Sequence, residues 1–135
     1  MTVIDAGPLV ALNNRNDPNH ARCLSALPRL RGPLIATWHV VTEAMHLLGR
    51  DVGWPGQSML IDLIADGRIE IAAQGQREAV RMRELLLQYR DVPMSVADAS
   101  IIVAAERSGA RCVFTVDSDF RVYRINGRDH CEVVP

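Results

Sequence analysis

The chain has 135 residues, of which 48% are hydrophobic and 23% charged, and this composition predicts one globular domain spanning 1–135. The formal net charge is −1, and all 15 basic residues are arginine. The absence of lysine excludes P-loop phosphate binding and Schiff-base catalysis. It also excludes the phosphoryl sites of receiver-like and haloacid-dehalogenase-like proteins, which depend on a lysine.

Features that would direct the chain to a membrane or out of the cell are missing. No apolar run approaches the ~20 residues of a membrane span, and the N-terminus lacks the basic start of a secretory signal. The three cysteines are an odd number without a C-x-x-C spacing, so we expect reduced thiols. We therefore expect a cytoplasmic protein.

The first half of the chain predicts short strands followed by helices. β-branched residues at 2–5 predict a strand that ends at an acid, and residues 9–12 suit a helix. Asp17, which precedes a proline, is expected to be the N-cap of a helix that extends to Leu27. A strand, a helix, a loop and another helix are then expected at 34–36, 39–48, 49–56 and 59–65.

The second half continues the same alternation. Strands are expected at 69–71, 111–116 and 133–134, and helices at 76–90 and 96–107. Strands that alternate with helices predict a parallel sheet, here of four to five short strands, between two helical layers. The expected fold class is therefore a three-layer α/β/α fold. In such folds the ligand lies outside the carboxyl ends of the strands.

Acidic residues from four separate segments are expected at that carboxyl edge. They are Asp5, Glu43, Asp98, Asp117 and Asp119. Like charges about 4 Å apart at an effective dielectric of about 20 repel by about 4 kcal/mol per pair, so such a cluster needs a counter-charge. A ligand set made only of oxygen suits Mg²⁺ or Mn²⁺. Without these acids the chain has 11 acidic residues against 15 arginines, a balance that suits a phosphodiester substrate.

Each of these acids also has a purely structural interpretation. Asp5 can end a strand before a turn, and Glu43 can be a solvated helix residue. Ser95 and Asp98 have the spacing of a helix capping box. The segment 117–119 fits an Asx turn. The conjunction of the acids is what favours a functional site.

Two further groups of residues have competing interpretations. His39, Glu43 and His46 share one helix face and could bind zinc, but their spacing is not that of zinc proteases. A structural or substrate-lining role of the histidines is therefore favoured. Trp38 and Trp54 could stack on bases. Because the chain has only six aromatic side chains, we expect both tryptophans in the core or at an interface.

Four motifs, taken together and in order, resemble the PIN-domain nucleases, in particular the VapC-type toxins of bacterial toxin–antitoxin pairs. They are V-I-D-A-G-P-L-V-A-L at 3–12, T-E-A-M at 42–45, M-S-V-A-D-A-S at 94–100 and F-T-V-D-S-D-F at 114–120. The resemblance extends over essentially the whole chain. One departure is the A-G-P that follows the first Asp, where many members carry Thr-Asn or Thr-Ser. This departure removes a side-chain hydrogen bond but no carboxylate.

The resemblance implies a PIN-like fold and a Mg²⁺-dependent endoribonuclease, with Mn²⁺ as a possible substitute. Activated water would hydrolyse the RNA and leave a 5′-phosphate and a 3′-hydroxyl. The catalytic acids would be Asp5, Glu43, Asp98 and Asp117. All of these except Glu43 would be metal ligands, with Asp119 as a further acid near the metal; Glu43 would bind a second metal or orient the water. Thr115 and Ser95 would support the site.

The resemblance also implies partners. They are an RNA substrate, a cognate antitoxin protein that silences the toxin, and a second copy of the chain in a homodimer. A groove between the helices at 9–14 and 39–48 could accept an antitoxin helix. The alternatives are a catalytically silent PIN-like binding module, and a metal-dependent phosphatase or DNA nuclease. Replacing Asp5 by Asn would abolish activity in an enzyme and leave a binding module unaffected.

Overall fold

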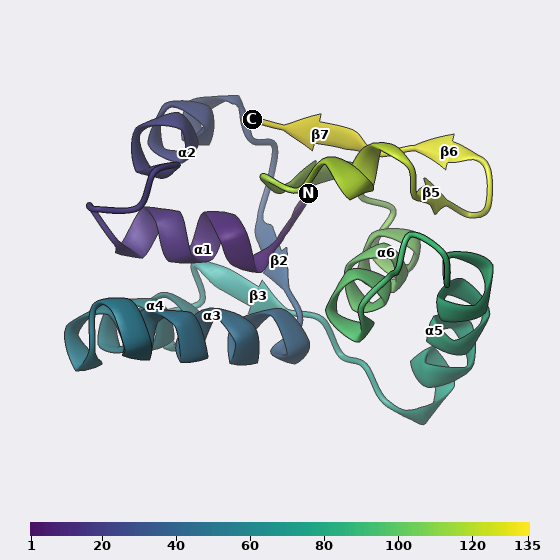
Figure 1. The fold of residues 1–135 in the computed structure, drawn as a ribbon, viewed down its shortest axis with the longest axis horizontal. Coiled ribbons are helices and arrows are strands. Elements are labelled where there is room, and N and C mark those ends of the chain that lie inside the picture. Colours follow the sequence, from purple (N-terminus) through teal and green to yellow (C-terminus); the bar gives the residue numbers. More distant parts are fainter.

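The computed structural model describes residues 1–135 and has a parallel β-sheet between two layers of helices (Figure 1). The strand order is β3-β2-β1-β4-β7, and each neighbouring pair is parallel. The strands are β1 (Thr2–Ile4), β2 (Leu34–Ala36), β3 (Ile69–Ile71), β4 (Cys112–Phe114) and β7 (Glu132–Val134). The expected three-layer α/β/α fold, with its parallel sheet of short strands, is thereby confirmed.

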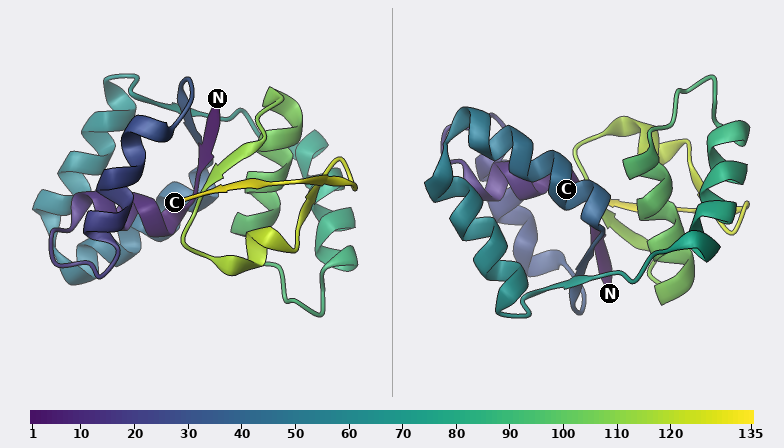
Figure 2. Two further views of the ribbon diagram at one scale, coloured as in Figure 1. Left: turned by 90° about the horizontal axis from the view of Figure 1, so that it is seen from above. Right: turned by 90° about the horizontal axis from the view of Figure 1, so that it is seen from below.

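Helices cover both faces of the sheet (Figure 2). One face carries α1 (Ala6–Asn13), α2 (His20–Ala26), α3 (Trp38–Asp51) and α4 (Trp54–Ala65). The other carries α5 (Gln76–Gln88) and α6 (Val96–Ser108). Between these layers the central strands β1, β2 and β4 are largely buried and consist mainly of apolar residues, as expected for strands that are covered on both faces. The edge strands β3 and β7 each carry an exposed glutamate, Glu70 and Glu132. No helix is both long enough and apolar enough to cross a membrane.

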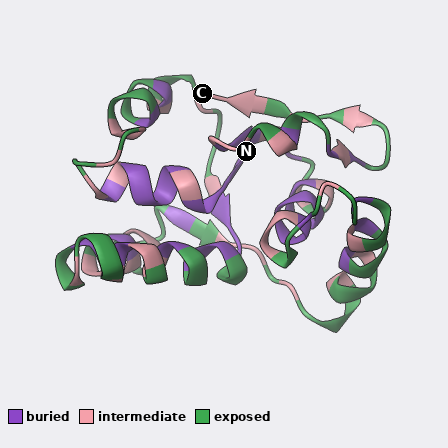
Figure 3. Ribbon diagram, in the orientation of Figure 1, coloured by how far each residue is buried: buried purple, intermediate pink, exposed green.

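The core is built around β1 and α6 (Figure 3). Every residue of β1 is buried, and so is the whole stretch 99–105 of α6. Helix α6 is buried nearly all round because it lies between the sheet and α5, whose outer face is exposed. A helix in this position must be apolar on all its faces, as the sequence A-S-I-I-V-A-A is apart from Ser100. Asp5 directly follows β1 and Asp98 lies on α6, so these two elements also position residues of the site described below.

A small hairpin after the 3₁₀ turn at Ser118–Arg121 is absent from the sequence-based expectation. It pairs β5 (Arg124–Ile125) with β6 (Asp129–His130) in antiparallel fashion. Asn126, Gly127 and Arg128 join the two strands, and the first two have φ values of 52° and 74°. An Asn-Gly dipeptide is the usual sequence signal of such a turn, because both residues tolerate positive φ. The signal was therefore present in the sequence.

The loop predicted at 49–56 is wrong. Helix α3 extends to Asp51 and α4 begins at Trp54, so only two residues separate them. Gly53 makes the sharp turn possible with a φ of 87°. Gly49 lies where an added Cβ would come within 2.5 Å of the Gln57 side chain, and Gln57 donates to the carbonyl of Met45. The glycines that suggested a loop instead allow two helices to pack closely.

Other boundaries shift by a few residues. The predicted N-cap at Asp17 is wrong, because α2 begins only at His20 and Asp17 instead accepts a hydrogen bond from the Asn19 backbone. The strand predicted at 2–5 ends at Ile4, and Asp5 becomes the N-cap of α1. Likewise β4 ends at Phe114 and not at 116. Both strands therefore stop immediately before polar side chains at the carboxyl edge.

Candidate active site

An acidic pocket of about 610 Å³ opens at the carboxyl ends of β1 and β4. No basic residue lines it. Its lining residues are Asp5, Ala6, Gly7, Glu43, Leu47, Pro93, Ser95, Asp98, Val116, Asp117, Ser118 and Asp119. The pocket thus contains all five acids that the sequence placed at this edge of the sheet. They come from the N-cap of α1, from α3, from α6 and from the turn after β4.

Asp5 is the most buried of the acids, with 9% of its surface exposed. Its Oδ1 accepts from the Ala6 backbone N–H at 2.7 Å, and its Oδ2 accepts from the Thr115 hydroxyl at 2.7 Å. Burial raises the pKa of Asp5 from 3.8 to about 6, despite the opposing effect of these two hydrogen bonds. The negative charges of Asp98 and Glu43 raise this pKa further. The charged form of Asp5 is therefore uncompensated in the protein alone.

Asp98 both caps helix α6 and lines the acidic pocket. Its backbone N–H donates to Ser95 Oγ at 3.1 Å, and its Oδ2 accepts from the Ser95 N–H at 3.3 Å, which completes the capping box of α6. The same Oδ2 accepts from the Tyr123 hydroxyl at 2.9 Å. The carboxylate is therefore held in one orientation at the mouth of the pocket.

Asp117 and Asp119 come from a polar turn after β4. The Asp117 N–H donates to Thr115 Oγ1 at 3.0 Å, and Asp117 Oδ1 accepts from the Asp119 N–H at 2.9 Å. Thr115 thereby links two acids, because its hydroxyl also donates to Asp5. The negative charge of Asp117 raises the pKa of Asp119. Asp117 therefore forms the expected Asx turn, and both Asp117 and Asp119 also line the acidic pocket.

Glu43 lies on α3, and its side chain is exposed to solvent where it lines the pocket. Leu47, one turn further along the helix, lines the same pocket. His39 and His46 are also exposed but do not line it. The two histidines that could bind zinc with Glu43 therefore lie outside the acidic pocket. The carboxylates are the only charged groups that line this pocket.

Gly7 allows the first turn of α1 to approach the turn after β4. A Cβ at this position would lie 2.7 Å from Val116 Cγ2, a distance that side chains do not adopt without displacement. The A-G-P sequence that departs from the family pattern therefore fits its surroundings. The Ala6 backbone N–H still binds the carboxylate of Asp5, as described above.

The chemistry of this pocket fits a hard divalent cation. Five carboxylates without a basic neighbour repel each other, and their oxygens are the ligands that Mg²⁺ and Mn²⁺ prefer. No group of three or more His, Cys, Asp or Glu side chains is arranged to hold an ion by itself. Mg²⁺ does not require such a group, because it usually keeps several waters and binds one or two carboxylates together with substrate phosphates.

Tyr123 is a part of the site that sequence reasoning missed. Its side chain is fully buried, and its ring contacts the rings of Tyr89 and Phe120 edge-on, with centroids 5.0 and 5.2 Å away. Burial, together with the hydrogen bond to Asp98, raises the pKa of Tyr123, so the hydroxyl stays a donor. No motif pointed to this residue. Its position four residues after Asp119 was the only clue.

Replacing Tyr123 by Phe should test this contact. The ring packing is retained, but Asp98 loses one hydrogen-bond donor. We expect the free energy of unfolding, measured by urea denaturation, to fall by about 1.5–3 kcal/mol, the usual range for a hydrogen bond to a charged group. A change below a few tenths of a kcal/mol would show that water replaces the hydroxyl without loss.

Comparison with known proteins agrees with this geometry. The curated protein "Ribonuclease VapC26" of Mycobacterium tuberculosis is 27% identical over 134 residues, which cover 98% of this chain and 99% of that protein. The crystal structure of VapC20 from the same organism, described as a sarcin-ricin loop cleaving toxin, superposes with a TM-score of 0.83 at 17% identity. That match covers 90% of this chain and 94% of the other. Residues 2–126 match the PIN domain family. The predicted family is thereby confirmed: the chain belongs to the PIN domain family.

Proposed function

We propose that the protein is a divalent-metal-dependent endoribonuclease and the toxin of a type II toxin–antitoxin pair. The observation that carries the proposal is the pocket in which five acids from four segments meet without a basic neighbour. Their site lies at the carboxyl edge of the sheet, where α/β folds bind their ligands. The near full-length similarity to a protein named as a VapC ribonuclease supports RNA as the substrate. We assign the activity to one domain that spans 1–135.

The acids have distinct proposed roles. Asp5, Asp98 and Asp117 hold the metal, directly or through its bound waters, and Asp119 is a further acid beside it. Glu43, the most solvent-accessible of the proposed catalytic acids, binds a second metal or orients the attacking water. When bound, Mg²⁺ supplies Lewis-acid stabilisation of the phosphate and a lowered pKa for water. Mn²⁺ has the same ligand preference and is the expected substitute.

The remaining side chains orient the acids. Thr115 donates to Asp5 and accepts from the Asp117 N–H, and Ser95 caps the helix that carries Asp98. Such supporting hydrogen bonds fix the direction of ligand oxygens and commonly change metal affinity or activity by about 10- to 100-fold. We therefore assign Thr115 and Ser95 as positioning residues.

The proposed partners are RNA, a cognate antitoxin and a second copy of the chain, all in the cytoplasm. A groove of about 410 Å³ between the end of α1 and the start of α4 supports protein binding. Its lining includes Val52 and Met59, which are exposed large hydrophobic side chains. We propose this side of the protein for docking of the antitoxin or of the second copy.

The test is cleavage of total cellular RNA by the purified protein, freed of antitoxin, with Mg²⁺, with EDTA and with the Asp98→Asn variant. An amide at this position can still accept from the Ser95 N–H and the Tyr123 hydroxyl, so the variant should fold. The exposed Asp62 on α4, changed to Asn, is the matched control. We expect discrete fragments with 5′-phosphate ends from the wild type and from Asp62→Asn only.

Two other outcomes would replace the proposal. Intact RNA with both Mg²⁺ and Mn²⁺, from folded wild-type protein, would favour a silent PIN-like binding module. Cleavage of DNA or of phosphate monoesters, with RNA left intact, would instead indicate a DNA nuclease or phosphatase in the same fold. Fragments that persist in EDTA or with Asp98→Asn would show that the acidic pocket is not the active site.

A further inference from the structure

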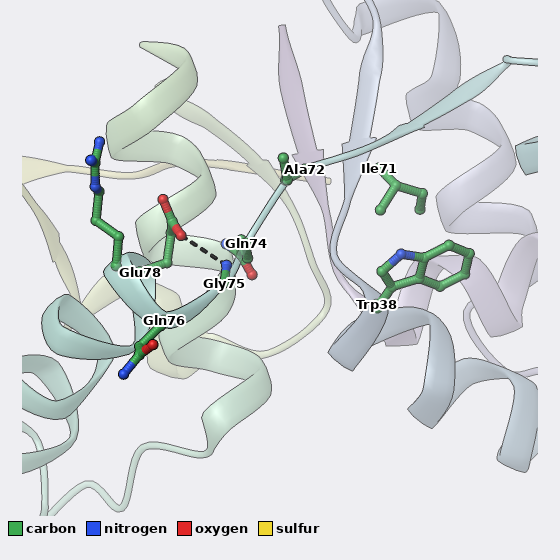
Figure 4. A pocket seen from close by; sticks show the side chains of 9 residues that line it. Trp38, Ile71, Ala72, Gln74, Gly75, Gln76 and Glu78 are labelled. Carbon is green, nitrogen blue, oxygen red and sulfur yellow. Dashed lines mark hydrogen bonds between the residues drawn. The ribbon is translucent and has the colours of Figure 1, made fainter.

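A second pocket, of about 770 Å³, opens at the carboxyl ends of β2 and β3 (Figure 4). It is larger than the acidic pocket and shares no residue with it. One wall is the segment 71–78, which leads from β3 into α5, and the other is Trp38 at the start of α3. The site proposed above uses none of these residues.

Trp38 is an exposed aromatic side chain held on a rigid support. It is 55% exposed, which excludes the core position and leaves the interface position of the two that were expected, and its indole lies beside Ile71 in Figure 4. The preceding Thr37 is fully buried and accepts from the Val40 N–H, and its hydroxyl lies 2.8 Å from that of Ser100 on α6. The backbone at Trp38 is therefore fixed, while one face of the ring remains available for stacking.

Gln74, on the opposite wall, has an unused acceptor. Its Nε2 donates to the Ser100 carbonyl at 2.8 Å. Because a carbonyl can only accept, this bond fixes which end of the amide is nitrogen. The other end, Oε1, is buried without any hydrogen-bond partner. Buried polar groups without partners are rare. A ligand N–H donor reaches this oxygen when the amide turns and gives up its bond to the Ser100 carbonyl.

The charges of the pocket favour an anionic ligand. Its one acid, Glu78, already accepts from the Gly75 N–H and lies 3.6 Å from Arg107. Arg77 is exposed and forms no ion pair. These groups match the parts of a nucleotide. The ring of Trp38 can stack on a base, Gln74 Oε1 can accept from the edge of that base, and the guanidinium of Arg77 can bind a phosphate.

The position of the second pocket relative to the acidic pocket also suits a nucleic acid strand that occupies both. In the order β3-β2-β1-β4, the second pocket lies over β2 and β3 and the acidic pocket over β1 and β4. Their centres are thus separated by two strand spacings, or about 10 Å along the edge of the sheet. The contact between Thr37 and Ser100 lies between them. A strand with its scissile phosphate among the acids would bring a neighbouring nucleotide to Trp38.

We propose that this second pocket binds a nucleobase of the RNA next to the cleaved bond. Trp38 stacks on the base, Gln74 Oε1 accepts from an N–H of that base, and Arg77 pairs with a phosphate of the same strand. This inference rests on the proposed ribonuclease function, because it assigns the pocket to the substrate of that reaction. The base then contributes to the choice of cleavage position.

The two tryptophans of the chain allow a direct binding test. Trp54→Phe leaves Trp38 as the only tryptophan, and Trp38→Phe leaves Trp54, which is 68% exposed and lies on α4. Each protein is titrated in EDTA with short oligo(A), oligo(U) and an abasic oligonucleotide of equal length. We expect oligo(A) to quench Trp38 fluorescence saturably and to leave Trp54 fluorescence unchanged. The abasic strand should bind without quenching either.

The strength of binding tests the individual contacts. Loss of one stacking partner should weaken oligo(A) binding by about tenfold or more in Trp38→Ala, and not in Trp54→Ala. Oligo(A) should bind more tightly than oligo(U), because adenine stacks over a larger area, while both bases carry an N–H donor for Gln74. A preference for oligo(U) would refute stacking on Trp38 as the main contact. Quenching of Trp38 by the antitoxin but by no RNA would overturn the proposal in favour of a protein-docking site.

Cleavage assays separate this inference from the function on which it rests. With wild-type protein that cleaves RNA, Trp38→Ala should raise KM about tenfold and leave kcat nearly unchanged. If the wild type is active and Trp38→Ala and Trp54→Ala have equal KM and kcat, the base-binding pocket is refuted while the nuclease function stands. An inactive wild type whose Trp38 is still quenched by oligo(A) would overturn the nuclease and retain the pocket.

Discussion

Asp5→Asn is expected to abolish RNA cleavage and, at the same time, to stabilise the metal-free protein. The pKa of the Asp5 carboxyl is raised to about 6, so its charged form is unfavourable in the folded state. An amide of the same shape can accept from the Ala6 N–H and donate to the Thr115 hydroxyl. It removes the buried charge while keeping both contacts. Loss of a metal ligand should lower activity by about a thousandfold, equivalent to about 4 kcal/mol.

The stability gain should depend on pH in a defined direction. Because the pKa of Asp5 is higher in the folded state than the 3.8 of the free group, the folded protein retains this proton more strongly. The stabilisation from the protonated carboxyl is complete below about pH 4 and is lost as pH rises through about 6. The shift corresponds to about 3 kcal/mol. Asp5→Asn has no carboxyl to lose this proton. The difference in the free energy of unfolding between Asp5→Asn and wild type should therefore grow between about pH 4 and pH 6 and then stay constant.

Urea denaturation in EDTA, at several pH values, measures this difference for Asp5→Asn against wild type and against the exposed control Asp62→Asn. Added Mg²⁺ should narrow the difference at neutral pH, because a bound cation compensates the charge of Asp5 in the wild type only. An Asp5→Asn protein that is less stable than wild type at neutral pH would show that the carboxylate is already compensated without metal. Stability and function would then not oppose each other at this position.

The sequence was sufficient for the order of the helices and of the five strands of the main sheet, because these strands are short and rich in apolar residues and the core helices have clear apolar patterns. It was not sufficient for the hairpin of β5 and β6. It was also sufficient to place the acids near each other, since parallel strands all end at one edge of the sheet. Asp5 and Asp117 follow β1 and β4, which are hydrogen-bonded neighbours. That neighbourhood cannot be derived from spacing, because the two strands are more than 100 residues apart in the chain.

The details that the sequence did not predict depend on tertiary packing. Gly49 and Gly53 have the composition of a loop, yet they allow α3 and α4 to pack closely. Tyr123 reaches Asp98 only because the 3₁₀ turn after Asp117 carries its ring under α6. The exposure of Trp38 follows from its position as the first residue of a helix whose N-cap is buried. Gly49 and Gln57 belong to different helices, and Tyr123 and Asp98 are 25 residues apart, so the apolar pattern of a single element contains no signal for these contacts.

Thr115→Val is expected to remove hydrogen bonds that orient two of the acids, Asp5 and Asp117. The side chain is buried, with 1% exposed, and valine has nearly the same shape. The substitution removes the donor to Asp5 Oδ2 and the acceptor for the Asp117 N–H. Since the Thr115 hydrogen bond lowers the pKa of Asp5, its loss should raise that pKa above its present value of about 6. The stability cost should be about 1–3 kcal/mol, the range for unpaired buried groups.

The effect of Thr115→Val on function should appear in metal affinity and in activity. Removal of a group that orients metal ligands typically costs about 10- to 100-fold, and we expect the Mg²⁺ concentration for half-maximal cleavage to rise by this factor. Thr115→Ser keeps the hydroxyl and loses only a methyl group, so it should restore most of the affinity. If Thr115→Ser were as impaired as Thr115→Val, the methyl packing would be the important property. Unchanged Mg²⁺ affinity and activity in Thr115→Val would mean that the hydroxyl is dispensable and that the backbone alone positions Asp5 and Asp117.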